Sequence, residues 1–460
     1  MGRLFGTDGV RGLANADVTA ELAVDLSVAA AHVLGEAGAF HLAEGHRPLA
    51  VVGRDTRISG QFLEAAVVAG LASAGVDVLL LGVLPTPGVA FLTDALKADL
   101  GVMLSASHNP MPDNGIKFLS RGGVKLDDAI EIAIEKRLRE PWQRPTGAGV
   151  GRVSTYDAAV TDYAEHLVST VGRHLGGAST GLGRPLKVVL DCAQGAASQA
   201  GPMALRAAGA DVVAICAEPD GLNINDGCGS THLEVLQRAV VELDADAGFA
   251  LDGDADRCLA VDHRGDVVDG DQILAVLALA MRDAGTLRAD TVVATVMSNL
   301  GFVQAMRREG VGVRQTKVGD RYVLEAMRAH QYNLGGEQSG HVIMTDYATT
   351  GDGILTALHV LDRMAERQAS LADLAGVVTR LPQVLVNVPD VDKSRTDEDA
   401  VVAAAVAEAE YELGEDGRVL LRPSGTEPLV RVMVEAATAA QARQVADRLA
   451  DVVRRQLALS

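Results

Sequence analysis

The sequence predicts an α/β protein with three similar, doubly wound α/β domains and a small α+β domain at the C-terminal end, around a central cleft. Three apolar, β-branched runs are typical of buried parallel strands: "LAVVGRDTR" from Leu49, "LKVVLDCAQG" from Leu186 and "TVVATVMSNLG" from Thr291. An Ala-rich helical pattern follows each run, and then a second and a third strand. This β-α-β-α-β alternation predicts doubly wound domains.

The second strands of the three blocks are "AGVDVLLLG" from Ala74, "AGADVVAICA" from Ala208 and "GVGVRQTKVG" from Gly310. The third strands end in three polar loops, "MLSASHNP", "FALDGDADR" and "LGGEQSGH". Ligands of such sheets bind outside the carboxyl ends of the strands. The three loops are therefore equivalent positions at which a site is expected.

The last part of the chain has a different pattern. "QVLVNVPDV" predicts a strand, "DEDAVVAAAVAEAEYEL" a helix, and "GRVLLRPSGTEPLVRVMVEA" two strands around a polar turn. The final helix has an apolar face that carries Val445, Leu449, Val452 and Val453. The chain is predicted to form four domains. Residues 1–160 contain the loop "SASHNP", called the serine loop, and residues 161–262 contain the loop "DGDADR", called the acidic loop. Residues 263–382 contain the "GEQSGH" loop, and residues 383–460 contain the "RPSGTEP" turn.

Composition supports several packed cores and excludes some functions. The 460 residues amount to about three domains of roughly 150 residues each. Hydrophobic residues make up 48% and aromatic residues only 3%, so Ala, Val and Leu must build the cores. The net charge of -20 argues against a nucleic-acid partner, whose binding surface would be basic. An anionic ligand would have to be attracted by local Arg and Lys.

The cysteines and the apolar runs indicate the compartment. Cys192, Cys216, Cys228 and Cys258 form no CxxC pair and are expected to be reduced thiols. The N-terminal "MGRLFGTDGVRG" lacks the apolar region of a secretory signal. No apolar run approaches the roughly 18 residues that span a bilayer. We therefore expect a soluble, cytoplasmic protein without a membrane partner.

The loop "LDGDADRC" has the composition of a cation site. Asp252, Asp254 and Asp256 alternate after an apolar strand, so in an extended segment their carboxylates would face one way. Such carboxylates repel one another unless a cation lies between them, and oxygen ligands of this kind suit Mg²⁺. Solvated aspartates in a turn are one alternative. An aspartyl-phosphate nucleophile of the haloacid-dehalogenase phosphatases is another, although that family usually has Thr or Val where this chain has Asp256.

The turn "RPSGTEP" resembles a phosphate cradle. It combines a guanidinium, two hydroxyls and small-residue backbone amides in Arg422, Ser424, Gly425 and Thr426, and Arg431 follows on the next strand. A plain Pro-Gly hairpin turn is the alternative. No Walker A motif occurs, so a P-loop nucleotide site is excluded.

Two further loops carry polar groups with weaker signals. "GGEQSGH" supplies Glu337, Ser339 and His341, which suit sugar hydroxyls but are equally compatible with an ordinary loop. "GRDTR" places Arg54 and Arg57 at a strand end. Taken singly, each arginine is expected to be a surface or ion-pair residue.

The loop "SASHNP" is the candidate for covalent chemistry. Ser107 is followed by His108 and Asn109, and Pro110 biases Asn109 away from the helical conformation, so the chain turns after the serine. Lys117 follows an Asp-Asn-Gly segment that is expected to turn. The GxSxG elbow of a serine hydrolase is absent, and a serine that caps a helix is the plain alternative. A serine, an Mg²⁺ site and a phosphate cradle at strand ends fit phosphoryl transfer with a phosphoserine carrier.

With these motifs in order, the chain closely resembles the α-D-phosphohexomutase superfamily over its whole length. "FGTDGVRG", "SASHNP", "DGDADR", "GEQSGH" and "RPSGTEP" occur in the family's order. The wording of "FGTDGVRG", "NINDGCGSTH", "TKVGDRYV" and "GEQSGH" resembles the glucosamine branch more than the phosphomannomutase or phosphoglucomutase branches. Those two branches are the nearest alternatives, and a phosphatase or an inactive sugar-phosphate sensor are more distant ones.

The resemblance implies a cytoplasmic isomerase that interconverts glucosamine 6-phosphate and glucosamine 1-phosphate through a 1,6-bisphosphate, on the route to UDP-N-acetylglucosamine and the cell wall. It implies Mg²⁺, a hexosamine 1,6-bisphosphate as intermediate and primer, sugar phosphates as partners, and a homodimer. It leaves the general base open between Lys117 and His108. The implied roles are a phosphorylated Ser107; Mg²⁺ ligation by Asp252, Asp254, Asp256 and the Ser107 phosphate; contacts to the transferring group from Arg11, His108, Lys117 and Arg257; and substrate binding by Glu337, Ser339, His341, Arg422, Ser424, Gly425, Thr426 and Arg431.

Overall fold

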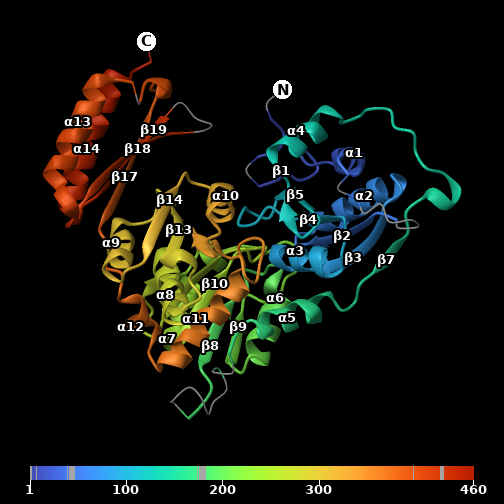
Figure 1. Cartoon of the computed structure of the whole chain (residues 1–460), viewed down its shortest axis with the longest axis horizontal. Helices are drawn as coiled ribbons and strands as arrows, with labels where there is room; N and C mark the ends of the chain where they lie inside the picture. Colours follow the sequence, from blue (N-terminus) through green and yellow to red (C-terminus); the bar gives the residue numbers. More distant parts are fainter. Residues whose placement is uncertain are drawn as a thin grey trace. The chain divides into compact units, whose positions relative to one another are not determined.

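The computed structural model describes residues 3–6, 8–38, 40, 47–172, 175, 183–396, 398–424 and 429–459. These residues form two compact units (Figure 1). The first unit comprises Met1–Val296 and Val311–Gly376, and the second comprises Met297–Gly310 and Val377–Ser460. The first unit contains three sheets and the second contains one, and each unit has its own hydrophobic core.

The first sheet of the first unit combines parallel and antiparallel strands. Its order is β1 (Val10–Leu13), β5 (Asp113–Ser120), β4 (Leu100–Leu104), β2 (Leu49–Arg54), β3 (Asp77–Val83) and β7 (Val153–Thr155), with β6 (Val124–Lys125) paired to β5. The accompanying helices are α1 (Ala20–Glu36), α2 (Ser59–Ser73), α3 (Thr86–Ala95) and α4 (Asp128–Lys136).

Helices cover both faces of this sheet. Ala50 and Val52 of β2 belong to one core with residues of α1, α2 and α4. The alternate residue Gly53 faces α3, where a Cβ would lie 2.5 Å from Val89. Because successive side chains of a strand point to opposite faces, the sheet is wound on both sides, as predicted.

The other two sheets of the first unit repeat this plan. The second has the order β12 (Val267–Val268), β11 (Cys258–Asp262), β10 (Ala247–Leu251), β8 (Lys187–Asp191) and β9 (Asp211–Ile215), with α5 (Ala159–Ser169), α6 (Ala197–Ala207) and α7 (Glu234–Glu242). The third has the order β14 (Gly312–Thr316), β13 (Thr291–Thr295), β15 (Leu334–Gly336) and β16 (Val342–Met344), with α8 (Gly270–Asp283), α10 (Asp320–His330), α11 (Gly353–Arg367) and α12 (Leu371–Ala375).

Each of the three sheets contains the predicted set of three parallel strands. The first strand of each block lies in the middle, between the second and the third. A fourth strand, not anticipated from the sequence, then returns antiparallel to the third: β5 beside β4, β11 beside β10 and β16 beside β15. The three polar loops are therefore the connections between a parallel strand and its antiparallel neighbour.

The second unit is a three-stranded antiparallel sheet with helices. Its order is β17 (Gln383–Pro389), β19 (Leu429–Glu435) and β18 (Arg418–Pro423), with α13 (Ala400–Leu413), α14 (Ala439–Gln456) and α9 (Leu300–Arg308). The predicted apolar face of α14 packs into the core through Val445, Leu449 and Val453. The buried carboxylate of Glu435 accepts hydrogen bonds from Arg418 Nε (2.7 Å) and Leu300 N (2.9 Å), which joins α9 to the sheet.

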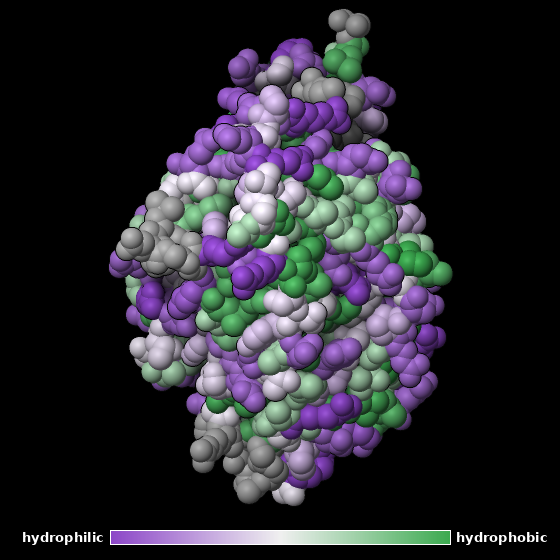
Figure 2. Space-filling model, turned by 90° about the vertical axis from the view of Figure 1, so that its right-hand side faces the viewer, coloured by the Kyte–Doolittle hydropathy of each residue, from purple (hydrophilic) through white to green (hydrophobic). Residues whose placement is uncertain are grey.

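Hydrophilic residues cover much of the molecular face in Figure 2, and hydrophobic residues lie in groups between them. Exposed apolar side chains of this kind are ordinary on folded proteins. Among the described residues, no helix has both the length and the apolar character needed to cross a bilayer.

Candidate functional site

The polar loops that follow β4, β10 and β15 meet within the first unit. The hydroxyl of Ser107 donates a hydrogen bond to Asp252 Oδ2 at 2.6 Å, although the two residues are 145 positions apart. His341 Nδ1, from the third loop, lies 3.6 Å from Asp256 Oδ1. The carboxyl ends of the three strands therefore bring the candidate residues of three separate motifs together.

Ser107 is buried and has a left-handed backbone conformation. Its φ is +53° and 1% of its surface is exposed. Its N–H donates to Ser105 Oγ (2.9 Å), and Ser105 Oγ donates to Asp55 Oδ2 (2.7 Å). A non-glycine residue adopts positive φ only at a cost in free energy. The surrounding hydrogen bonds therefore hold the serine in a strained conformation that points its hydroxyl at Asp252.

The side chain of Arg57 supports the serine loop by hydrogen bonds to its backbone carbonyls. Its side chain is fully buried, and all five of its guanidinium N–H groups have acceptors. The acceptors are Asp55 Oδ2 (2.9 Å) and the carbonyls of Ser107 (3.0 Å), Asn109 (2.8 Å), Pro110 (2.5 Å) and Asp113 (3.0 Å). The sequence predicted a surface or ion-pair residue, and the ion pair with Asp55 is present. The role in the loop was missed because backbone carbonyls leave no mark in a sequence.

Asn225 holds the same loop from the second sheet's side. Its side-chain amide donates to the carbonyls of Ser107 (2.9 Å) and Asn109 (3.1 Å). Its own backbone N–H donates to Ala193 O (2.9 Å). The motif "NINDG" contains this residue, but nothing in the sequence indicates that its amide reaches the serine loop.

The three aspartates of the acidic loop converge. One carboxylate oxygen from each of Asp252, Asp254 and Asp256 lies within 4.8 Å of the others, and all three side chains are buried. Burial, together with the charges of Asp256 and Asp254, raises the pKa of Asp252 well above its usual range. Oδ1 of Asp254 and Oδ1 of Asp256 are buried without a hydrogen-bond partner among the described residues. This set of unsatisfied, mutually repelling oxygens fits a hard divalent cation such as Mg²⁺.

Two local predictions about these loops were wrong. The acidic loop is a tight turn with Ala255 at φ +57°, not an extended segment, so the turn brings the carboxylates together. The Asp-Asn-Gly segment before Lys117 is not a turn but the start of β5. Gly115 is required there for close packing, because a Cβ would lie 2.5 Å from Ser105 O.

Lys117 lies between carboxylates of two motifs. Its Nζ is 2.7 Å from Asp254 Oδ2 and 2.7 Å from Asp8 Oδ2. Burial alone would lower the pKa of Lys117, but Asp254 and Asp8 outweigh burial and raise it, so the amine is protonated at neutral pH. Thr86 Oγ1 also donates to Asp254 Oδ2, at 2.6 Å. Asp8 and Thr86 are thus site residues that sequence reasoning missed.

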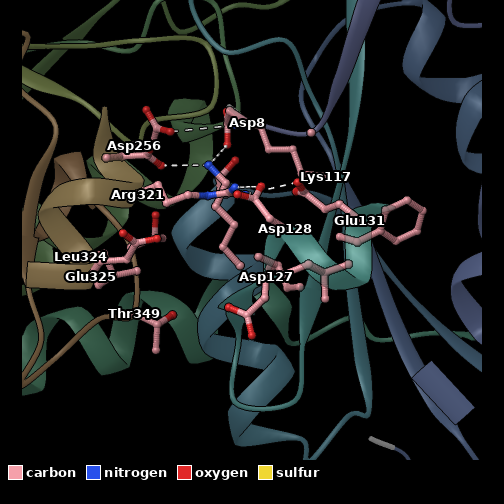
Figure 3. A pocket seen from close by; sticks show the side chains of 18 of the residues that line it. Asp8, Lys117, Asp127, Asp128, Glu131, Asp256, Arg321, Leu324, Glu325 and Thr349 are labelled. Carbon is pink, nitrogen blue, oxygen red and sulfur yellow. Dashed lines mark hydrogen bonds and ion pairs between the residues drawn. The ribbon is translucent and has the colours of Figure 1, made fainter. Parts of the chain in front are cut away.

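A cavity of about 290 Å³ opens beside Lys117 (Figure 3). Figure 3 shows the lysine pointing at Asp8 and Asp256, while Arg321 reaches Asp128 and Glu131 close by. This cavity shares Asp8, Asp256 and His341 with a second cavity of about 390 Å³.

Arginines and a histidine line the second cavity, next to Ser107. Its lining includes Arg11, His108 and Arg257, all predicted to contact a transferring group. Nδ1 of His108 lies 3.2 Å from the Ser107 hydroxyl oxygen. Burial, and then the charges of Arg257 and Arg11, lower the pKa of His108, so its ring is neutral at neutral pH. These arginines provide the local positive charge that an anionic ligand needs in a protein of net charge -20.

The third loop contributes residues to the same region. Glu337 lines the second cavity, and its Oε1 accepts a hydrogen bond from Gly319 N at 3.0 Å. Ser339 is exposed. His341 is buried; its Nε2 lies 3.2 Å from Gly351 N and its Nδ1 lies 3.6 Å from Asp256 Oδ1. Burial alone would lower the pKa of His341, but the charge of Asp256 outweighs burial and raises it to about 9. His341 therefore places positive charge beside a carboxylate of the acidic loop.

The second unit holds the predicted phosphate-binding residues that the structure describes. Arg422 and Arg431 are direct partners on β18 and β19. Burial, and then the charge of Arg431, lower the pKa of Arg422. Ser424 is buried, and its N–H donates to Leu429 O (2.9 Å). Like charges opposite each other on a sheet are unfavourable unless an anion lies between them, so this pair fits a phosphate. The predicted Gly425 and Thr426 lie outside the described residues.

Four family models match successive parts of the chain. Each describes a region of phosphoglucomutase/phosphomannomutase: alpha/beta/alpha domain I at residues 2–144, domain II at 161–265, domain III at 269–381 and the C-terminal domain at 385–452. Two solved structures share the fold over nearly the whole of both chains. One is a phosphoglucomutase/phosphomannomutase family protein from Burkholderia thailandensis, with a TM-score of 0.80, 24% identity and coverage of 99% and 98%. The other is a putative phosphomannomutase from Thermus thermophilus, with a TM-score of 0.77, 27% identity and coverage of 98% and 98%.

Curated relatives are much more similar in sequence. A phosphoglucosamine mutase of a Nocardioides species is 74% identical over 459 residues, which cover 100% of each chain. Phosphoglucosamine mutases of Streptomyces griseus and Cutibacterium acnes are 68% and 61% identical, with coverage of 99% and 100% of this chain. The chain belongs to the phosphoglucosamine mutase family, a group of isomerases built from the four phosphoglucomutase/phosphomannomutase domains.

Proposed function

We propose that the chain interconverts glucosamine 6-phosphate and glucosamine 1-phosphate, with Ser107 as the carrier of the phosphoryl group. The observation that carries this proposal is the 2.6 Å contact of the Ser107 hydroxyl with Asp252, one of three buried and convergent carboxylates. A phosphate on that hydroxyl would lie beside the acidic loop on one side and the cationic cavity on the other. Sugar phosphates are negatively charged, which is complementary to the arginines of that cavity.

The reaction consists of two phosphoryl transfers. In the first, the bond between phosphorus and Ser107 Oγ breaks while a bond from phosphorus to the free sugar hydroxyl oxygen forms; the sugar hydroxyl loses its proton and Ser107 Oγ gains one, which gives glucosamine 1,6-bisphosphate and a free serine. The bisphosphate turns round, and Ser107 Oγ loses its proton as it takes the other phosphoryl group, while the sugar oxygen that is left behind gains a proton. A first phosphoryl group from a hexosamine 1,6-bisphosphate primes the serine.

Asp252, Asp254 and Asp256 would hold Mg²⁺ together with the Ser107 phosphate. The cation would neutralise charge on the transferring phosphoryl oxygens. Lys117, protonated between Asp8 and Asp254, adds fixed positive charge on the same side.

The groups around the serine have separate roles in this scheme. Arg11 and Arg257 bind the oxygens of the transferring group. In the structure the serine proton points at Asp252, and His108 Nδ1 lies 3.2 Å from Ser107 Oγ; when the hydroxyl turns to His108, Nδ1 can accept the proton as the serine attacks and return it as the serine leaves. The neutral ring of His108 fits this role better than the protonated amine of Lys117.

Two sets of residues bind the substrate in this proposal. Glu337 and Ser339 contact sugar hydroxyls, and Arg422, Ser424, Gly425, Thr426 and Arg431 bind the phosphate that does not react. A mutase must hold one phosphate while the other moves, so a clamp separate from the serine is required. We also propose that the chain has four domains, with boundaries near residues 160, 262 and 382.

The proposal places the enzyme in the cytoplasm, as a homodimer whose partners are sugar phosphates and neither nucleic acids nor membranes. A phosphorus NMR time course with Mg²⁺ and a trace of glucosamine 1,6-bisphosphate tests the reaction. A C1-phosphate signal should grow faster from glucosamine 6-phosphate than from the 6-phosphates of glucose or mannose. Release of inorganic phosphate alone would mean a phosphatase, and faster conversion of glucose or mannose would assign another substrate.

A further inference from the structure

The described residues contain a second group of side chains with the spacing of metal ligands. It consists of Asp191, Cys216 and Cys228, whose ligand atoms lie within 4.8 Å of one another. All four cysteines of the chain are free thiols. Asp191 and Cys228 are buried, whereas Cys216 is partly exposed. The group is distinct in residues and in donor chemistry from the acidic loop.

The fold brings these three residues together from three elements. Asp191 ends β8, Cys216 directly follows β9, its parallel neighbour, and Cys228 precedes a short 3-10 turn, Gly229–Thr231. Backbone amides fix the carboxylate, because Oδ1 accepts from Ala193 N (2.8 Å) and Oδ2 from Gly229 N (2.9 Å). Each carboxylate oxygen has a second lone pair, so Asp191 can hold these bonds and also bind a cation.

Because it has two sulfur ligands and one carboxylate, this group prefers a different cation than the three carboxylates of the acidic loop do. Thiolate ligands favour zinc and similar soft ions, whereas Mg²⁺ prefers oxygen ligands alone. The partial exposure of Cys216 leaves an open side for a water molecule as the fourth ligand. We propose that Asp191, Cys216 and Cys228 form a binding site for a thiophilic divalent cation of the zinc class.

Occupation of this site acts on the serine loop through Asn225. That residue lies in the segment between the two cysteines, and its side chain donates to the carbonyls of Ser107 and Asn109. A cation that pulls Cys216, Cys228 and Asp191 together shifts this segment and weakens the support of Ser107. This second step rests on the proposed mutase function, whereas the binding step does not.

The binding step is tested with Cd²⁺ alone as a spectroscopic probe, on the full chain without Mg²⁺. One equivalent of Cd²⁺ should give a thiolate-to-metal absorption band, and Zn²⁺ should displace it. Cys216→Ala and Cys228→Ala should each weaken binding more than about 100-fold, because loss of a ligand exceeds the roughly 10- to 100-fold cost of changing a neighbour of a ligand. Cys258→Ala, at a buried thiol outside the group, is the matched control and should bind as the unmodified chain does.

Absence of the band at stoichiometric Cd²⁺ would overturn the proposal, and so would a band that persists in both variants. Cys216→Ser and Cys228→Ser, which keep the side-chain shape, replace any alanine variant that does not fold.

The second step, the effect on the serine loop, is tested by adding one equivalent of Zn²⁺ in excess Mg²⁺. Mutase turnover should fall at least about fivefold in the unmodified chain but not in Cys216→Ala. An equal response of both proteins would refute the link to Ser107, and no turnover without Zn²⁺ would instead count against the mutase function.

Discussion

Replacing Asn225 by Ala tests whether support of the serine loop sets the rate of phosphoryl transfer. The substitution removes two hydrogen bonds, to Ser107 O (2.9 Å) and Asn109 O (3.1 Å), and leaves those that Arg57 makes to the same carbonyls. The fold should therefore survive, while the left-handed conformation of Ser107 becomes less favoured.

The size of the effect follows from the number of bonds lost. A hydrogen bond between uncharged groups contributes about 0.5–1.5 kcal/mol net, so two contribute about 1–3 kcal/mol. If this free energy is lost from the catalytically competent arrangement, kcat falls between about 5-fold and 150-fold, at 1.36 kcal/mol per tenfold. KM for glucosamine 6-phosphate should change less than about twofold, because Asn225 lines neither of the two cavities of the site.

The assay measures kcat, KM and the single-turnover rate of Ser107 phosphorylation from glucosamine 1,6-bisphosphate. Asn223→Ala is the matched control, because its amide lies two residues away and donates to Glu218 O (3.1 Å). The reasoning is refuted if Asn225→Ala keeps the original kcat, or if Asn223→Ala lowers kcat equally.

Three further predictions concern stability, the metal and pH. Arg57→Lys reduces five N–H donors to three, so at least two buried hydrogen bonds are lost. The free energy of unfolding, measured by chemical denaturation, should fall by about 2 kcal/mol or more. Arg54→Lys is the control and should show a smaller loss. Asp254→Asn removes one charge from the acidic loop and should raise the Mg²⁺ concentration for half-maximal activity about tenfold or more, and an unchanged metal response would place the cation elsewhere. Burial lowers the pKa of His359 to about 4, against about 6.5 in the unfolded chain. The unfolded state therefore binds an extra proton between these values, and stability should fall by about 3 kcal/mol as pH drops from 6.5 to 4. His359→Gln should flatten that part of the pH profile, and an identical profile would exclude His359 as its source.

The fold could be predicted to a large extent because its repeats leave a strong pattern. The apolar runs from Leu49, Leu186 and Thr291 became the central strands β2, β8 and β13. The returning strands β5, β11 and β16 were missed because each directly follows a polar loop and contributes to no further β-α-β unit, so the repeat pattern does not indicate them. Helix α9 joins the second unit through Glu435, a contact over 135 residues that no local pattern indicates.

The candidate site divides along similar lines. Ser107 and the three aspartates could be found because their chemistry is unusual at a strand end. Arg57 and Asn225 could not, because their partners are backbone carbonyls, which are the same for every sequence. Asp8 could not be assigned either, since it lies in a turn before β1 and its partner Lys117 lies on β5, more than 100 residues further along the chain.

Direct detection of phosphate on Ser107 tests the central claim. The protein is incubated with Mg²⁺ and glucosamine 1,6-bisphosphate, digested and analysed by mass spectrometry, beside Ser107→Ala as the control. The account predicts one phosphate on the peptide that contains Ser107, its loss on addition of glucosamine 6-phosphate, and neither label nor turnover in a folded Ser107→Ala protein. Phosphate on an aspartate of the acidic loop, or full turnover in Ser107→Ala, would contradict it.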